Sequence, residues 1–166
     1  MTDTTDSELF DPAGIEWQPV SPRLATARFI LLAVFVGGPL VVFAVLGAVL
    51  STTWPWIVAG ALAVLGVLVA LVVGRQVRSI GYAERDEDLL VRKGVLFRSL
   101  VVVPYGRMQF VDVSAGPLAR KLGIASVQLH TASPSTDANI DGLPPAEAAR
   151  VRDRLASRGE ARLAGL

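Results

Sequence analysis

The sequence contains no cysteine and only one histidine in 166 residues. The lack of cysteine excludes disulfides, thiol nucleophiles and thiolate metal sites. A single histidine also excludes a His-rich metal centre, and we expect neither a metal nor a cofactor. The net charge is only +1, so nucleic acid is not expected as a partner, because binding to phosphates requires an excess of clustered Lys and Arg.

Charge is also missing from a long internal part of the chain. No Lys, Arg, Asp or Glu lies between residues 29 and 74. This part contains two apolar runs, residues 29–50 and 56–74, separated by the short link "STTWP". A helix of the first length spans about 33 Å, enough to cross a hydrocarbon core of roughly 30 Å. The short link predicts antiparallel neighbours, so residues 15–78 are interpreted as a transmembrane hairpin.

Small residues and a proline indicate how these helices pack. Gly66, Ala70 and Gly74 share one face of the second helix, and Ala44 and Ala48 share one face of the first. Such faces let two backbones approach closely in lipid. The sequence Gly37-Gly38-Pro39 predicts a kink in the first helix.

The basic residues beside the hairpin predict its orientation. Arg23 and Arg28 precede the first helix, Arg75 and Arg78 follow the second, and the link carries no charge. Since Lys and Arg remain on the cytoplasmic side, both termini are expected to be cytoplasmic. A cleaved signal peptide fits less well, because the first run is too long and begins too late. The polar, acidic residues 1–14 are expected to be disordered.

After the hairpin, the pattern becomes that of short strands. Alternation and turn residues predict a turn or single helical turn at 116–123, and strands at 79–85, 89–93, 95–103, 108–115, 124–131 and 138–141. An amphipathic helix of about 14 residues begins at Pro145, with Ala148, Val151 and Leu155 facing inward. We therefore expect an α+β module at 79–159, a small bent β-sandwich or open barrel capped by its C-terminal helix, followed by a tail at 160–166.

One long segment resembles a known family. The run "LLVRKGVLFRSLVVVPYGRMQFVDVSAGPLARKLGIASVQLHTA", the later "IDGL" and the terminal helix are similar to the bacterial pleckstrin-homology-like, membrane-flanked family, the YdbS-like proteins. "EWQPVSPRLATARFILL" resembles the start of that family's transmembrane hairpin. The resemblance implies a pleckstrin-homology-like fold in a bacterial cell (inner) membrane, and it brings no established catalytic residues.

Four cations are the candidate contacts for anionic lipid or a partner: Arg98, Arg107, Arg120 and Lys121. Arg120 and Lys121 follow a Gly-Pro turn and are expected to be exposed, each contributing on the order of 1 kcal/mol at an anionic surface. Arg107 and Asp112 also fit a structural interpretation, as surface charges or a strand-to-strand pair. Phosphoinositide-binding relatives of this fold use a basic pocket between their first two strands, whereas the corresponding loop here is taken as the acidic "ERDED".

No catalytic set emerges from the titratable residues. Asp112, His130 and a serine have suitable side chains, but no serine lies in a nucleophile elbow, and His130 is predicted to point outward from its strand. Residues 86–88 lack the spacing of a calcium loop and are interpreted as a solvated turn. The chain is therefore not expected to be an enzyme.

Three functions remain open. The first is an interaction or scaffold module that offers sheet edges and loops to a protein partner, with membrane lipids surrounding the hairpin. The second is peripheral contact with anionic phospholipid through Arg120, Lys121 and the arginines that flank the hairpin. The third is an accessory subunit of an envelope transport or stress-response complex, contacted through the hairpin. Homo-oligomers are compatible with all three.

Overall fold

The computed structural model describes residues 14–95, 97–132 and 136–163, which form two compact units. One unit is the helical hairpin of residues 25–75. The other combines the N-terminal segment that ends at Leu24 with the segment that begins at Gln76. The disorder expected for residues 1–14 concerns a region that, apart from Gly14, lies outside the described residues.

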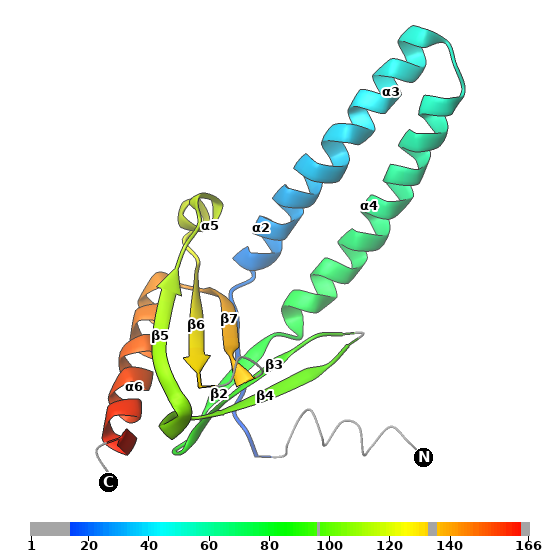
Figure 1. Ribbon diagram of the computed structural model, residues 1–166. Helices are drawn as coiled ribbons and strands as arrows, with labels where there is room; N and C mark the ends of the chain where they lie inside the picture. Colours follow the sequence, from blue (N-terminus) through cyan, green and yellow to red (C-terminus); the bar gives the residue numbers. More distant parts are fainter. Residues whose placement is uncertain (1–13, 96, 133–135, 164–166) are drawn as a thin grey trace, which may run out of the picture. The chain divides into compact units, whose positions relative to one another are not determined.

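The hairpin consists of two helical rods long and apolar enough to cross a membrane. The first comprises α2 (Arg23–Leu32), the π-helical turn η1 (Ala33–Gly37) and α3 (Gly38–Leu50) (Figure 1). The second is α4 (Trp54–Arg78). Both rods extend past the predicted apolar limits, because the flanking arginines continue the helices beyond the part that lipid must cover.

The π turn is the structural consequence of Pro39. Proline has no N–H to donate to the carbonyl four residues earlier, and its ring crowds that carbonyl. The chain widens just before it, and the Gly38 N–H bonds to the Ala33 carbonyl five residues back. The irregularity that the sequence predicts here therefore takes the form of a π-helical segment.

Two close contacts hold the rods together. A Cβ at Gly47 would lie 2.6 Å from Trp56 Nε1, so only glycine fits under that indole ring. Gly66 lies against Val36, with 3.4 Å between the position of an added Cβ and Val36 Cγ1. Gly66 and Ala70 line an apolar groove of about 420 Å³ between the rods, as their spacing predicts. Gly47 was not singled out by the sequence pattern, because it belongs to no small-residue repeat.

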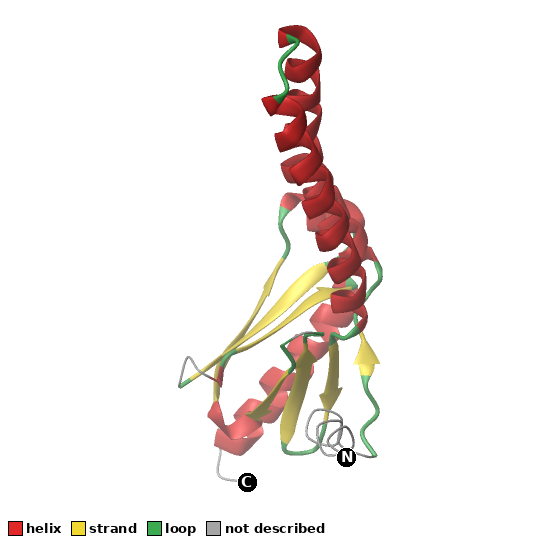
Figure 2. Cartoon of the chain, turned by 90° about the vertical axis from the view of Figure 1, so that its right-hand side faces the viewer, coloured by secondary structure: helices red, strands yellow, loops and turns green. Residues whose placement is uncertain are grey.

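The second unit contains two antiparallel sheets and a helix (Figure 2). Sheet A has the order β1 (Gln18–Pro19), β2 (Gly81–Glu84), β3 (Asp88–Lys93), β4 (Ser99–Pro104). The 3₁₀ turn η2 (Tyr105–Arg107) leads into sheet B, whose order is β5 (Met108–Ser114), β6 (Ala125–Thr131), β7 (Ala138–Leu143). The short α5 (Pro117–Leu122) joins β5 to β6, and α6 (Pro145–Leu163) ends the described chain. The predicted fold class is confirmed.

The core of this unit comes from both sheets and α6. Alternate residues of β6 point inward, and Val127 and Leu129 are completely buried. The predicted stripe of α6 is buried as well, with Ala148, Val151 and Leu155 each 0% exposed. Helix α6 packs along β5, β6 and η2 (Figure 1). It is longer than predicted, because its helical hydrogen bonding continues to Leu163.

One strand begins later than its sequence pattern indicates. Strand β4 starts at Ser99, not at residue 95. Gly94 has φ +98°, and a Cβ there would lie 1.8 Å from the Phe97 carbonyl oxygen. The chain reverses sharply at Gly94, and Val95, Phe97 and Arg98 lie outside both strands, although apolar side chains of this kind are typical of a strand.

Strand β1 was not predicted, and it changes how the unit is built. Gln18 and Pro19 pair with Tyr82 and Gly81, so the membrane hairpin is the connection between two neighbouring strands. The Ser21 N–H donates to the Gly142 carbonyl at 2.9 Å, which ties the same segment to sheet B. The folded unit is thus assembled from chain on both sides of the hairpin, whereas the sequence placed it wholly after residue 78.

Candidate functional site

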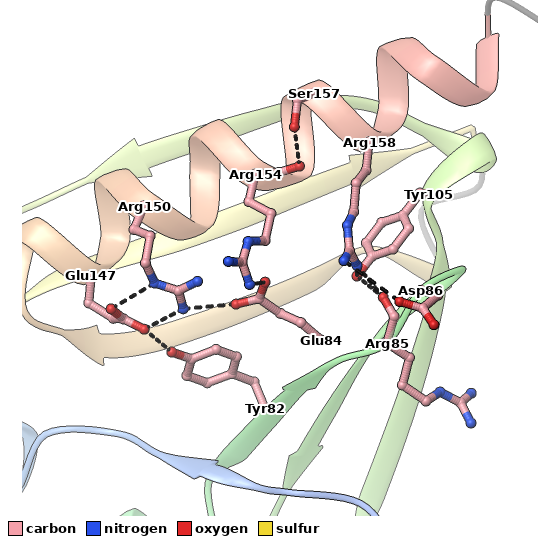
Figure 3. Close-up of polar contacts among 10 residues, drawn as sticks. All are labelled: Tyr82, Glu84, Arg85, Asp86, Tyr105, Glu147, Arg150, Arg154, Ser157 and Arg158. Carbon is pink, nitrogen blue, oxygen red and sulfur yellow. Dashed lines mark hydrogen bonds and ion pairs between the residues drawn. The ribbon is translucent and has the colours of Figure 1, made fainter. Parts of the chain in front are cut away.

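The densest group of charged side chains joins α6 to the end of β2 (Figure 3). Glu84, whose side chain is only 5% exposed, accepts hydrogen bonds from Arg150 Nη2 at 2.9 Å and from Arg154 Nη1 at 3.0 Å. Glu147 accepts one from Arg150 Nε at 3.0 Å and one from the Tyr82 hydroxyl at 2.6 Å. These contacts clamp the helix onto sheet A, and we call these five residues the α6 clamp.

The contacts within the α6 clamp determine the protonation states of Glu147 and Tyr82. Hydrogen bonds from Arg150 and then Tyr82 lower the pKa of Glu147 to about 2. Burial, followed by the hydrogen bond to Glu147, raises the pKa of Tyr82 well above its usual value. A general base requires a pKa near the working pH. Glu147 is instead permanently ionised at neutral pH and serves as an ion-pair partner.

The acidic turn between β2 and β3 is also engaged in structural contacts. Arg85 forms a bidentate pair with Asp88, with both N···O distances at 2.6 Å. The Arg85 carbonyl accepts hydrogen bonds from the Tyr105 hydroxyl at 2.9 Å and from Arg158. Burial raises the pKa of Tyr105. The turn therefore anchors η2 and α6, and its excess of carboxylates does not suit an anionic ligand.

His130 has a different partner from the one considered in the sequence. Its Nδ1 lies 3.3 Å from a carboxylate oxygen of Asp137, and its ring stacks on Phe110 with 4.3 Å between centroids. Asp112 lies opposite Gln128 in the sheet, and no hydrogen bond or ion pair joins it to His130 within the described residues. The pKa of Asp137 is lowered, chiefly by the hydrogen bond that it accepts from the Thr131 N–H at 2.8 Å. No residue pattern indicated Asp137, because it lies outside the alternating stretches of the sequence.

Two of the predicted cations lie beside the start of a membrane helix. Helix α5 sits at the end of sheet B where Ser114 faces Ser126. At this end, the Leu122 carbonyl accepts a hydrogen bond from Arg23 Nη1 at 3.4 Å, and Arg23 is the first residue of α2. Arg120 and Lys121 are both exposed on α5. We call these two residues the α5 cations.

Arg98 lies at the corresponding end of sheet A. Gly81 pairs with Arg92, and Lys93 pairs with Ser99, so the β3–β4 turn is at the end where β2 begins. Only residues 79 and 80 separate β2 from α4. Arg98 is exposed there. The ends of both sheets that carry Arg98 and the α5 cations are therefore the ends joined to the membrane helices.

Arg107 lies at the opposite ends of the sheets. It belongs to η2, between Pro104, which pairs with Asp88, and Met108, which pairs with Thr131. At a rise of 3.3 Å per residue, β5 separates it from the α5 end by roughly 20 Å. It is exposed, and its side chain has no hydrogen bond or ion pair within the described part of the chain. The structure thus separates Arg107 from the other three candidates.

Comparison with known proteins agrees with this architecture. A family model described as "Bacterial PH domain" matches residues 20–159. The "UPF0699 transmembrane protein YdbS" of Bacillus subtilis (strain 168) is 37% identical over 107 residues, which cover 61% of this chain and 66% of the relative, just under two thirds of its length. No solved structure matches the chain. The resemblance drawn from the sequence is confirmed.

The ionised state of Glu147 predicts a specific dependence of stability on pH. Its folded-state pKa of about 2 lies below the ordinary 4.5, so its contribution is complete above pH 4.5 and is lost as the pH falls toward 2. Glu147→Gln should lower the melting temperature at pH 7 by roughly 5–10 °C, corresponding to about 1–2 kcal/mol, and flatten the loss at low pH. Thermal unfolding of the full chain in nanodiscs, followed by circular dichroism, measures both effects.

Asp153→Asn is the matched control for this experiment. Asp153 also pairs with an arginine of α6, but its side chain is 68% exposed, and exposed pairs contribute little. It should leave the melting temperature and its pH dependence nearly unchanged. Equal pH profiles for Glu147→Gln and the unaltered chain would contradict the assignment.

Proposed function

We propose that this chain, which belongs to the bacterial PH domain family, is a non-enzymatic membrane protein whose PH-like module binds at the membrane surface through anionic lipid headgroups. The module is the two-sheet unit capped by α6, and the hairpin anchors it. One observation carries the proposal: α5 contacts Arg23 at the start of α2 and presents the α5 cations to solvent.

The α5 cations differ from the arginines of the α6 clamp in having no carboxylate partner within the described residues. Arg150 and Arg154 are bound to carboxylates of the α6 clamp. The side chains of Arg120 and Lys121 make no hydrogen bond or ion pair with any described residue. Their charges are therefore available to an external anion, and the nearest anionic surface to the start of a membrane helix is the lipid headgroup layer.

Distance limits which cations can take part. Each basic residue at an anionic surface contributes about 1 kcal/mol, and the attraction decays over a screening length of roughly 10 Å. The α5 cations together would supply about 2 kcal/mol, a factor of roughly 30 in the docked population. Arg107, about 20 Å away along β5, would supply little.

The contacts of the titratable residues support a non-enzymatic function. Glu147 is held ionised by Arg150. The imidazole of His130 is engaged by Phe110 and Asp137. These groups hold strands and helices together, and an acid–base role would require them to be released from those contacts.

The flanking charges support a cytoplasmic position for the module. Arg23 and Arg28 lie at the start of one membrane rod, and Arg75 and Arg78 lie at the end of the other. The link of residues 51–53 has no charge. Basic residues remain on the cytoplasmic side, so we place the module and both termini inside the bacterial cell (inner) membrane.

A protein partner at the free sheet edges is the second candidate. Strands β4 and β5 are edge strands, and Val102 and Phe110 on them are 41% and 57% exposed. Unpaired edges with exposed apolar side chains are suited to accept an added strand, from another protein or from a second copy. This candidate requires no anionic lipid, which separates it from the first.

Lipid contact can be measured on the full chain because it has no native cysteine. An added Cβ at Gly116, next to α5, meets no atom within 4 Å, so Gly116→Cys can carry a nitroxide label. In nanodiscs, collisions with oxygen and with a water-soluble nickel chelate report the depth of the label. Anionic lipid should bring the label closer to the phosphates than zwitterionic lipid does, and 1 M salt should reverse the shift.

Charge removal gives the controls for this measurement. Arg120→Gln with Lys121→Gln should abolish the dependence on anionic lipid, while Arg107→Gln should preserve it. A label depth that is the same in both lipids would contradict lipid contact and leave the edge-strand candidate.

Membrane orientation is tested with two other single cysteines. Thr52→Cys in the link should react with a membrane-impermeant maleimide added to intact protoplasts, and Ser157→Cys on α6 should react only after permeabilisation. The reverse pattern would place the module outside the cell.

A further inference from the structure

We infer that a hollow between the end of β3 and strands β6 and β7 binds a small zwitterion, a molecule that carries both a primary ammonium and a carboxylate or phosphate. The described lining of this hollow includes neither the α5 cations nor any residue of the edge strands β4 and β5. The inference therefore goes beyond the proposed lipid contact, and either can fail without the other.

Polar residues from both sheets meet in this hollow. Strand β3 of sheet A lies beside β7 of sheet B (Figure 1). Lys93 lines the hollow from the end of β3, and the polar residues that line it from sheet B and the start of β7 are Gln128, His130, Asp137 and Asn139. Leu129 and Ala138, which are only 0% and 6% exposed, also line it. Several polar groups that converge beside buried apolar side chains are typical of a small-molecule site.

The volume of the hollow limits the ligand to a small molecule. The volume is about 300 Å³, which is at the lower end of the range of roughly 300–1,000 Å³ found for ligand pockets. At about 30 Å³ per water molecule, this is room for about ten waters. An amino acid or a phosphoethanolamine group fits such a space, whereas a dinucleotide does not.

The lining offers one charge of each sign. Lys93 supplies an ammonium and Asp137 a carboxylate, whose pKa is lowered chiefly by the hydrogen bond that it accepts from the Thr131 N–H. A simple anion would be repelled by Asp137, and a simple cation by Lys93, whereas a zwitterion matches both. The Lys93 ammonium has three donors, so it can bind the anionic group of a ligand in addition to its interaction within the chain.

A buried acceptor beside the hollow favours a ligand that has N–H donors. The Asn139 Nδ2 donates to Asp141 at 2.9 Å, which fixes the orientation of the amide. The Asn139 Oδ1 is buried and accepts no hydrogen bond from any described residue. A buried acceptor without a donor is unfavourable, so a ligand that supplies the missing donor gains affinity. A primary ammonium has three donors, enough for both Asn139 and Asp137, whereas a quaternary ammonium has none.

The single histidine of the chain provides a reporter for this site. His130 lines the hollow, so isotope-labelled histidine gives one imidazole Cε1–H NMR signal from the full chain in phosphatidylcholine nanodiscs. At constant pH, glycerophosphoethanolamine or L-serine should shift this signal saturably. Glycerophosphocholine carries the same charges but no N–H on its ammonium, and it should bind at least tenfold more weakly than glycerophosphoethanolamine. Inorganic phosphate, which lacks the ammonium, should also bind at least tenfold more weakly.

Charge removal at Lys93 tests the anionic half of the ligand. Lys93→Gln should weaken the binding of the zwitterion at least tenfold. Arg152→Gln is the matched control, because it also removes one positive charge but lies on α6, outside the lining of the hollow. It should change the affinity less than twofold. Unchanged thermal unfolding shows that each variant is folded, and the comparison of the two glycerophospho compounds requires no variant.

Nanodiscs of a second composition identify the source of the ligand. A shift of the His130 signal when phosphatidylethanolamine replaces phosphatidylcholine, abolished by Lys93→Gln, would assign the site to a lipid headgroup. A response to the soluble zwitterions alone would assign it to a free small molecule. A signal that responds to neither would overturn the inference, as would equal affinities for the zwitterions and for inorganic phosphate. The depth of the label at residue 116 is measured separately, so these results leave the α5 contact to its own test.

Discussion

The pairing of β1 with β2 is the interaction on which the rest of this structure depends. Only two residues form β1, yet its Gln18, which precedes the membrane hairpin in the sequence, pairs with Tyr82, which follows it. The Arg92 guanidinium lies 4.4 Å from the centre of the Trp17 ring, and Ser21 is bonded to Gly142 in the other sheet. Leu24 packs directly against Gly142 of sheet B, since a Cβ added at Gly142 would lie 2.7 Å from the Cβ of Leu24. The hairpin is thus the connection between two strands of one sheet.

This arrangement attaches the module to the membrane through two covalent links. Sheet A is linked to α2 through residues 20–22, which follow β1, and to α4 through residues 79 and 80. The hydrogen bond from Ser21 to Gly142 holds the first of these links against sheet B. A module held in this way meets the lipid surface at a high effective concentration, so contacts of about 1 kcal/mol per cation suffice to bias its docking. We propose that the α5 cations use this proximity, and that Arg107 at the far ends does not.

Much of the fold could be predicted because local patterns specify it. Uncharged length specified the two membrane rods, alternation and turn residues specified six of the seven strands found among the described residues, and the stripe that includes Val151 and Leu155 specified the buried face of α6. Strand β1 was not predicted, because a strand of two residues has no periodicity that the sequence could show. The turn at Gly94 escaped because the apolar side chains around it suggest a strand, while its φ of +98° is visible only in the backbone.

The sites were harder to predict, since they join distant parts of the chain. Arg120 and Lys121 are exposed, as expected, and so are Arg98 and Arg107. The sequence could not separate Arg107 from the α5 cations, because their separation depends on the direction of the strands. The bond between Glu84 and Arg150 joins residues 66 positions apart, and no spacing rule anticipates it. His130 was correctly predicted to point away from the core, but its partner Asp137 was not found.

The most direct test of the composite module removes the hairpin. Residues 1–24 joined to residues 76–166 by a flexible Gly-Ser linker should give a dispersed amide NMR spectrum and a cooperative thermal transition. Residues 76–166 alone, which lack β1 and Leu24, should melt at a clearly lower temperature or not cooperatively. Equal stability of the two proteins would contradict the account, because the segment before the hairpin would then contribute nothing to the fold.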